Sequence, residues 1–145
     1  MNLTIYRNFK NALYTEGKMH INGGFQTYTL ESTTNMLPEG NYIVRIVKKS
    51  ARKQYIGIFA TDDTGSILTS TRWKIGIGSS FIHSKKRRMI IIGIPLIRGA
   101  MYKSAKDYNR ITDRLMKCIT RREPITLTIT ERRCRPSTPT CHWLR

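Results

Sequence analysis

Short segments in which apolar and polar residues alternate recur along the first half of the chain, and they constrain the fold more than any other feature. Leu3 and Ile5 begin such a segment, and residues 41–48, 55–60 and 66–77 continue the pattern. A period of two places alternate side chains on opposite faces of a β-strand. The clearest case is ITLTIT at 125–130, which alternates at every position. We therefore predict a β-rich fold of about seven or eight strands.

Glycine-containing segments divide these predicted strands. Residues 15–18 (TEGK) and 62–65 (DDTG) each predict a turn, because glycine adopts positive φ without steric cost. Gly23 and Gly24 separate two β-type segments, which predicts a hairpin over residues 19–30.

One segment has helical periodicity instead. Ser104 is followed three residues later by Asp107, a capping arrangement, and an apolar stripe then runs through Tyr108, Ile111, Leu115 and Ile119. The fold class predicted is α/β-type mixed (α+β): a mostly antiparallel, partly barrel-like sheet with one main helix near residues 104–120. A single compact β-rich domain is expected over 3–130, and 131–145 is expected to be a basic extended tail.

The charge balance is strongly basic. The chain has 26 lysines and arginines against nine aspartates and glutamates, a formal net charge of +17, of which residues 84–145 contribute +12. Such a field attracts polyanions, so nucleic acid or an acidic protein surface is the expected partner. The predicted polyanion-binding residues lie in short basic runs: Lys85, Lys86, Arg87, Arg88, Arg121, Arg122, Arg132, Arg133 and Arg135.

These runs are expected to contact phosphates without reading sequence. Four consecutive cations at Lys85–Arg88 would alternate faces on a strand, so a loop that presents all four is predicted. Phosphate contacts give affinity but carry no base information. No helix-turn-helix, zinc-finger or RNA-recognition signature accompanies them, so nonspecific binding is expected.

The remaining residue types predict no cofactor and no metal site. Cys134, Cys141 and His142 have unsuitable spacing for zinc and lack a fourth ligand. Cys118 is expected on the buried side of the helix, as a reduced thiol. The start of the chain has no signal-peptide pattern, and the longest apolar run, Met89–Ile97, is too short to span a bilayer. The expected location is the cytoplasm, or a particle assembled there.

Four motifs in order resemble domain-of-unknown-function family 5675, an uncharacterised group of phage and bacterial domains. The motifs are YTLE at 28–31, LPEGNY at 37–42, Ile82-His83, and IGIPLIRG at 92–99. The resemblance as a whole covers most of the chain, roughly residues 3–130. The family pattern is itself remotely similar to the L,D-transpeptidase fold, in which a histidine and a Gly-Cys pair form a thiol site. His83 and Gly93 match that pattern, whereas Ile94 occupies the position of the cysteine.

Isoleucine cannot act as a nucleophile, so His83, Gly93 and Ile94 form a degenerate motif and no catalytic residue is predicted. The resemblance and the charge together predict a non-enzymatic phage-type accessory or virion-associated protein whose basic surface contacts nucleic acid or an acidic protein. The alternative is an enzyme-derived protein of L,D-transpeptidase-like ancestry that binds or cleaves peptidoglycan.

Overall fold

The computed structural model describes residues 1–131, with the backbone alone for residues 69–71. Within that range the chain is mostly strand, and its two helices lie in the second half. The mixed α+β fold with a largely antiparallel sheet confirms the predicted class. The elements, in order, are β1 (Asn2–Lys10), β2 (Tyr14–Ile21), β3 (Gly24–Ser32), β4 (Gly40–Lys48), β5 (Gln54–Thr61), β6 (Ile67–Gly76), α1 (Phe81–Arg87), β7 (Met89–Pro95), β8 (Met101–Lys103), α2 (Ala105–Thr120) and β9 (Thr126–Thr130).

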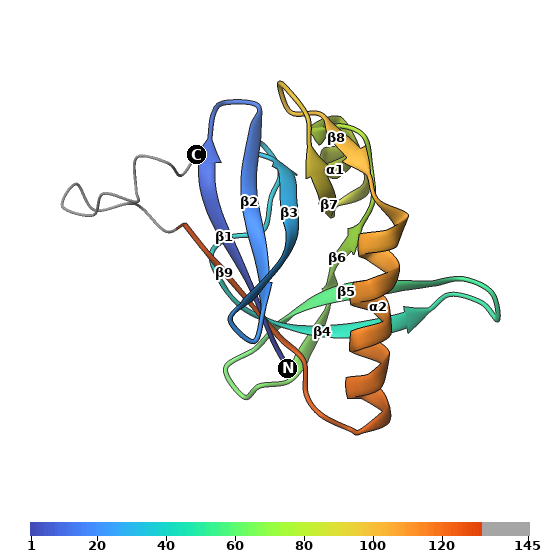
Figure 1. The fold of residues 1–145 in the computed structure, drawn as a ribbon. Helices are drawn as coiled ribbons and strands as arrows, with labels where there is room; N and C mark the ends of the chain where they lie inside the picture. The colour runs from blue at the N-terminus through green and yellow to red at the C-terminus, as the bar shows by residue number, and fades with distance from the viewer. Residues whose placement is uncertain (132–145) are drawn as a thin grey trace.

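The sheet curls on itself into a ring (Figure 1). Its strand order is β3-β2-β1-β9-β4-β5-β6-β7-β8, and an additional pairing of β3 with β7 joins its two ends. This is a ring-like sheet and not a true barrel. Two pairings, β1 with β9 and β6 with β7, are parallel, and the others are antiparallel. The last strand, predicted from ITLTIT, therefore lies between the first strand and β4.

The main core lies inside this ring. Alternate residues of β1, β2, β4, β5, β6, β7 and β9 contribute to it, among them Leu3, Ile5, Ile58 and Leu127, all with no exposed surface. α2 packs its apolar side against the same core (Figure 1). Burial on this scale is the main stabilising term for a domain of this size.

α2 confirms the predicted helix, with one correction to its buried stripe. Ser104 caps the helix, because its hydroxyl accepts a hydrogen bond of 3.2 Å from the backbone N–H of Asp107. Ile111 and Leu115 are fully buried, but Ile119 is 40% exposed. The last buried position of the helix is Cys118, a free thiol, one residue earlier than predicted. Neighbouring positions on a helix point in different directions, so Ile119 faces away from the core.

The sequence did not predict α1, which covers the outer face of the ring. Phe81 packs against an outer apolar cluster formed by Leu30, Met89, Ile91 and Met101 from β3, β7 and β8. A helix of seven residues is too short to show a helical period in the sequence. It is also too short to be stable in isolation, so it depends on these tertiary contacts.

One predicted turn was wrong. Residues 15–18 lie inside β2, and the turn between β1 and β2 falls at residues 11–13. Gly17 serves a different purpose: a Cβ there would lie 2.6 Å from both the Thr29 hydroxyl and the Tyr6 carbonyl oxygen. The hairpin over 19–30 is confirmed, with Asn22 and Gly23 in its turn at φ of 49° and 86°.

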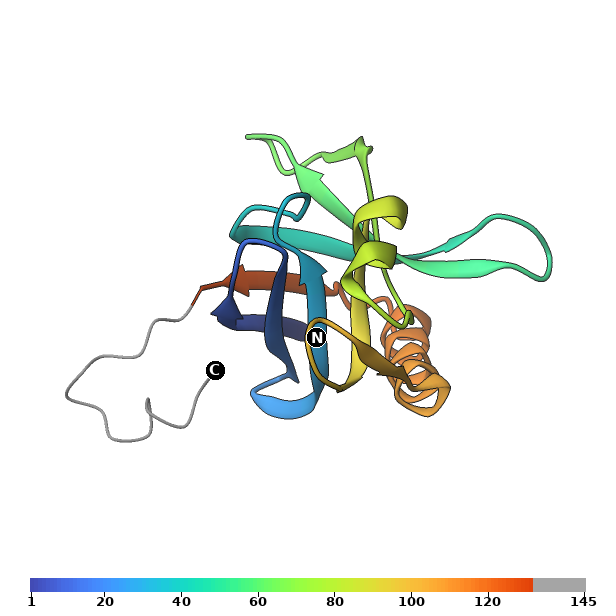
Figure 2. The same ribbon diagram turned by 90° about the horizontal axis from the view of Figure 1, so that it is seen from above.

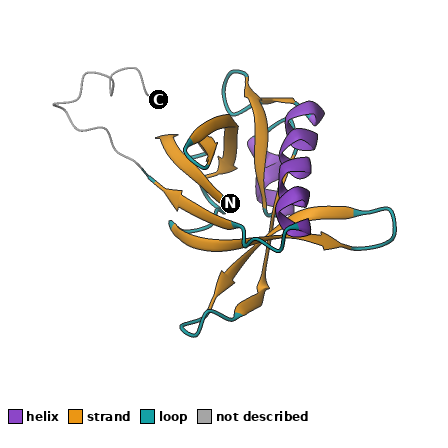
Figure 3. Ribbon diagram, turned by 60° about the horizontal axis from the view of Figure 1, so that its bottom comes forward, coloured by secondary structure: helices purple, strands orange, loops and turns teal. Residues whose placement is uncertain are grey.

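Two hairpins extend beyond the ring, one joining β4 to β5 and one joining β5 to β6 (Figure 2). Figure 3 shows the same two hairpins from a third direction. We call the β4–β5 projection, residues 45–57, the arm. Neither described helix is long and apolar enough to cross a membrane. Apart from Glu131, the predicted tail over 131–145 lies outside the described residues.

Candidate polyanion-binding surface

The four predicted cations at Lys85–Arg88 are exposed at the end of α1. The predicted loop was wrong, because Lys85, Lys86 and Arg87 form the last turn of the helix and Arg88 is its left-handed C-cap at φ 49°. Cations at this end are favoured by the partial negative charge of the helix C-terminus. All four side chains can therefore face solvent without the alternation that a strand would impose.

A buried serine fixes α1 in place. The Ser84 hydroxyl donates to the Met89 carbonyl at 2.6 Å and accepts from the Ser32 backbone N–H at 3.2 Å. Ser84 has no exposed surface, so these bonds are shielded from competition by water. They connect the helix to β3 and to β7, and so set the position of the adjacent cations.

The remaining predicted polyanion-binding residues do not join the cations of α1. Arg121 and Arg122 are exposed beyond the end of α2, at the opposite end of the molecule from α1 (Figure 1). Arg132, Arg133 and Arg135 lie outside the described residues. The predicted set therefore does not form one continuous patch within residues 1–131.

Two lysines lie over the ring of Tyr55, and a third cation lies near one of them. The Nζ atoms of Lys49 and Lys74 lie 5.4 Å and 5.8 Å from the centre of the Tyr55 ring, within cation–π range. Arg87 is close enough to act electrostatically on Lys74. We call Lys49, Lys74, Arg87 and Tyr55 the Tyr55 cluster; its members come from the arm, β6 and α1.

Lys74 reports the electrostatic state of this cluster. Desolvation by burial lowers its pKa, and the positive charges of Lys49 and Arg87 lower it further. Three ion pairs form among residues 1–131, namely Arg7–Glu31, Lys10–Glu131 and Arg110–Asp107, and none includes a member of the cluster. The cluster is a concentration of positive charge without a carboxylate partner in the described part of the chain.

Strand register explains how residues far apart in sequence meet here. Tyr55 of β5 lies opposite Val47 of β4, within the arm. Gly57, two residues after Tyr55 on the same strand, lies opposite Lys74 of β6. Lys74 in turn lies opposite Met89, immediately after α1. Side chains two residues apart share a face of a strand, so Tyr55 and Lys74 lie on the same outer face.

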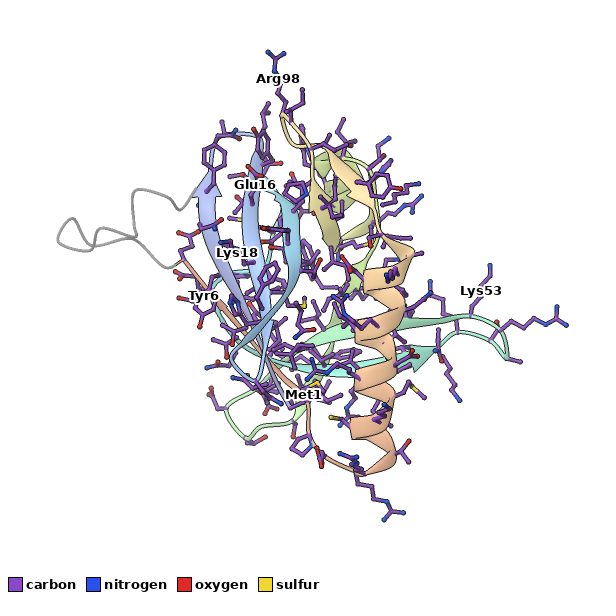
Figure 4. The ribbon with its side chains drawn as sticks, in the orientation of Figure 1. Met1, Tyr6, Glu16, Lys18, Lys53 and Arg98 are labelled. Atoms are coloured by element: carbon purple, nitrogen blue, oxygen red, sulfur yellow. The ribbon has the colours of Figure 1, made fainter. Side chains whose placement is uncertain are left out.

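The arm adds cations beyond the cluster. Its tip carries Lys48, Lys49, Arg52 and Lys53, all exposed. Ser50 shapes the turn, since its hydroxyl accepts from the backbone N–H of Lys53 at 3.2 Å. Lys53 lies at the far end of this projection, well outside the ring (Figure 4).

The residues of the degenerate motif lie on different elements. His83 is in α1, where its Nδ1 accepts a 3.2 Å hydrogen bond from the Ser79 backbone N–H. The Ser79 hydroxyl is 3.4 Å from the same nitrogen. Because the backbone N–H already uses the Nδ1 lone pair, that nitrogen is not available to deprotonate the Ser79 hydroxyl.

Gly93 and Ile94 belong to β7. Ile94 pairs with Tyr102 of β8, and its side chain is 51% exposed. A Cβ at Gly93 would lie 2.6 Å from the Tyr102 carbonyl oxygen, so the close approach of β8 accounts for this glycine. Among residues 1–131, no three His, Cys, Asp or Glu side chains are grouped to hold a metal ion. Cys134, Cys141 and His142 are outside that range.

Sequence reasoning missed Tyr55 and Lys74. A partial signal exists for Lys74, which lies between the buried Trp73 and Ile75 and so belongs to the opposite face of its strand. Nothing in the linear sequence indicates that this face meets α1 and the arm.

Comparison of the chain with protein-family models, with curated proteins and with solved structures finds no match.

Proposed function

We propose that this chain is a non-enzymatic binding protein that holds the phosphate backbone of a nucleic acid against the Tyr55 cluster and the exposed end of α1. The observation that carries the proposal is that Lys49 and Lys74 converge on the Tyr55 ring and Arg87 lies near Lys74, with no carboxylate partner among residues 1–131. Phosphate contacts of this kind supply affinity and position without sequence readout.

The lowered pKa of Lys74 supports an anionic ligand. Bringing cations together is unfavourable, and a bound phosphate would relieve the repulsion that Lys49 and Arg87 exert on Lys74. Lys85, Lys86 and Arg88 lie beside Arg87 and extend the positive surface along α1. The exposed cations of the arm tip extend it in the other direction.

Binding without catalysis is proposed because Ile94 stands where the resembled family pattern has its nucleophile. The phage or virion setting rests on that same resemblance. An acidic protein surface in an assembled particle is the second partner that the charge permits.

The test is the salt dependence of binding to duplex DNA. For a protein that neutralises phosphates, the logarithm of the binding constant falls with the logarithm of salt concentration by about 0.9 per phosphate contact. A variant with Lys49→Gln, Lys74→Gln and Arg87→Gln should lose up to about 2.7 from that slope, since it removes three contacts.

The matched control removes the same charge at the opposite end of the molecule, with Lys117→Gln, Arg121→Gln and Arg122→Gln. It should retain most of the slope. Equal losses of slope in the two variants would mean that only net charge matters. DNA binding that does not depend on salt would contradict the nucleic-acid proposal and leave an acidic protein as the candidate partner.

A further inference from the structure

A row of aromatic and basic side chains crosses the outer face of the ring, away from the Tyr55 cluster. In strand register, Tyr6 of β1 lies opposite Lys18 of β2, which lies opposite Tyr28 of β3. Tyr28 lies opposite Gly93 of β7, which lies opposite Lys103 of β8. Five strands thus place an aromatic, a cation, an aromatic, a glycine and a cation side by side.

A second pair of rings lies next to this row. His20, opposite Phe25, is on the same face of β2 as Lys18. The rings contact one another in series: Tyr6 to His20 at 5.0 Å, His20 to Phe25 at 5.8 Å and Phe25 to Tyr28 at 5.1 Å between centroids, all edge to face. We call Tyr6, Lys18, His20, Phe25, Tyr28 and Lys103 the aromatic row.

Two rings of this row, Phe25 and Tyr28, are exposed. Phe25 is 48% exposed and Tyr28 is 36% exposed, whereas Ile5, Met19 and Ile92, on the opposite face of the neighbouring strands β1, β2 and β7, are fully buried. α1 covers the neighbouring part of this outer face. Its Phe81 packs on the outer apolar cluster, whose β3 member is Leu30, two residues beyond Tyr28. Edge-to-face contacts hold the rings in fixed orientations, and the exposed parts of Phe25 and Tyr28 remain open to a ligand.

The charges beside the rings are mostly positive. Lys18 lies between Tyr6 and Tyr28, and Lys103 is exposed beyond Gly93. Glu16 lies two positions before Lys18 on the same face of β2 and borders the row on the side of α1 (Figure 4).

We infer that the aromatic row binds single-stranded nucleic acid, with bases stacked on Phe25 and Tyr28 and phosphates near Lys18 and Lys103. Unpaired bases stack on exposed aromatic side chains, while adjacent cations follow the backbone. A duplex hides its base faces and cannot use the rings in this way. The inference rests on the proposed function only in taking nucleic acid as the ligand class, since it uses a different surface.

The experiment compares fluorescein-labelled oligothymidylate with an abasic oligonucleotide of the same length, which keeps the phosphates and lacks the bases. The Phe25→Leu, Tyr28→Leu variant should bind oligothymidylate about 5-fold or more weakly, because each stacked base contributes appreciably to affinity. Its affinity for the abasic strand and its salt slope should stay as in the unmodified chain.

Two further variants keep the result independent of folding. Tyr28→Phe retains a ring and should restore binding, and Tyr102→Leu removes an exposed tyrosine outside the row and should change nothing. The inference is overturned if the unmodified chain binds both strands equally, or if Tyr102→Leu loses as much as the double variant.

The same assay separates this inference from the proposed function. Loss of salt slope only in the Lys49, Lys74 and Arg87 variant supports the Tyr55 cluster, whatever the aromatic row does. Loss of base-dependent affinity only in the Phe25 and Tyr28 variant supports the row, even if the cluster variant keeps its full slope.

Discussion

Burial desolvates both Arg7 and Lys74, but the charges around the two side chains are opposite in sign. The Arg7 guanidinium is buried with Glu31, at 2.9 Å from Nε and 2.7 Å from Nη2, and also donates to the Leu37 carbonyl at 2.6 Å. Burial alone would lower the pKa of Arg7, but the hydrogen bond and charge of Glu31 outweigh it and raise the pKa. Lys74 has two cations as neighbours, and its pKa is lowered.

The difference separates a structural charge from one available to a partner. Arg7 is satisfied within the chain and anchors the 33–39 connection, where Tyr42 also donates to the Pro38 carbonyl at 2.6 Å. The LPEGNY segment is thus held by side-chain bonds to its carbonyls. The cations around Tyr55 have no such partner among the described carboxylates, so an external anion can supply one.

The largest expected effect breaks the buried pair. Glu31→Gln leaves the Arg7 charge buried without compensation and should lower the free energy of unfolding by about 3–5 kcal/mol, measured by chemical denaturation. The double variant Arg7→Met, Glu31→Leu removes both charges and should be less destabilised than the single one. A double variant as unstable as Glu31→Gln would show that the pair contributes through its hydrogen bonds to the connection instead.

Leu115→Ala gives an uncharged reference for the same depth of burial. The side chain has no exposed surface, so its truncation should lower the free energy of unfolding by about 2–5 kcal/mol. Ile119→Ala is the matched control on the same helix, since Ile119 is 40% exposed. Thermal melting should separate the two, and similar losses would place Ile119 in the core after all.

Lys74→Gln should slightly stabilise the protein, whereas Glu31→Gln and Leu115→Ala destabilise it. The pKa of Lys74 is lower in the folded protein, so its contribution to stability is present above its unfolded value of about 10.4 and is lost as pH falls through the folded pKa. Near neutral pH the charge therefore opposes folding, and its removal should change the free energy of unfolding by no more than about 0.5 kcal/mol, toward greater stability. Low salt should enlarge the gain, and a loss of stability at low salt would contradict the repulsion.

His20 extends the comparison to the aromatic row. Desolvation by burial and then the charge of Lys18 lower its pKa below the usual 6.5. Between the folded pKa and that value the unfolded chain binds more protons, so stability should decline as pH falls from about 7 through this window. Denaturation at several pH values should show a shallower decline in His20→Gln. Lys18→Gln should raise the pKa of His20, and an unchanged pKa measured by NMR would contradict the contribution of Lys18.

The sequence predicted well where local pattern and burial agree. ITLTIT became β9 because Leu127 and Ile129 face the core and the threonines face away. Ser104 began α2 because its hydroxyl caps the first turn. The prediction was wrong where a contact distant in sequence decides. Gly17 lies in β2 and not in a turn, and it is glycine because a Cβ there would lie 2.6 Å from Thr29 and from Tyr6.

The candidate surfaces divide in the same way. The net charge of +17 and the four cations at Lys85–Arg88 are properties of composition, and they alone favour a polyanion partner. Which cations act together was decided only by the closed ring, which brings β4, β5, β6 and α1 side by side and leaves Arg121 and Arg122 at the other end. Strand register across β1, β2, β3, β7 and β8 likewise assembles the aromatic row from segments up to about a hundred residues apart, because hydrogen bonding between strands fixes neighbours that no local pattern of residues specifies.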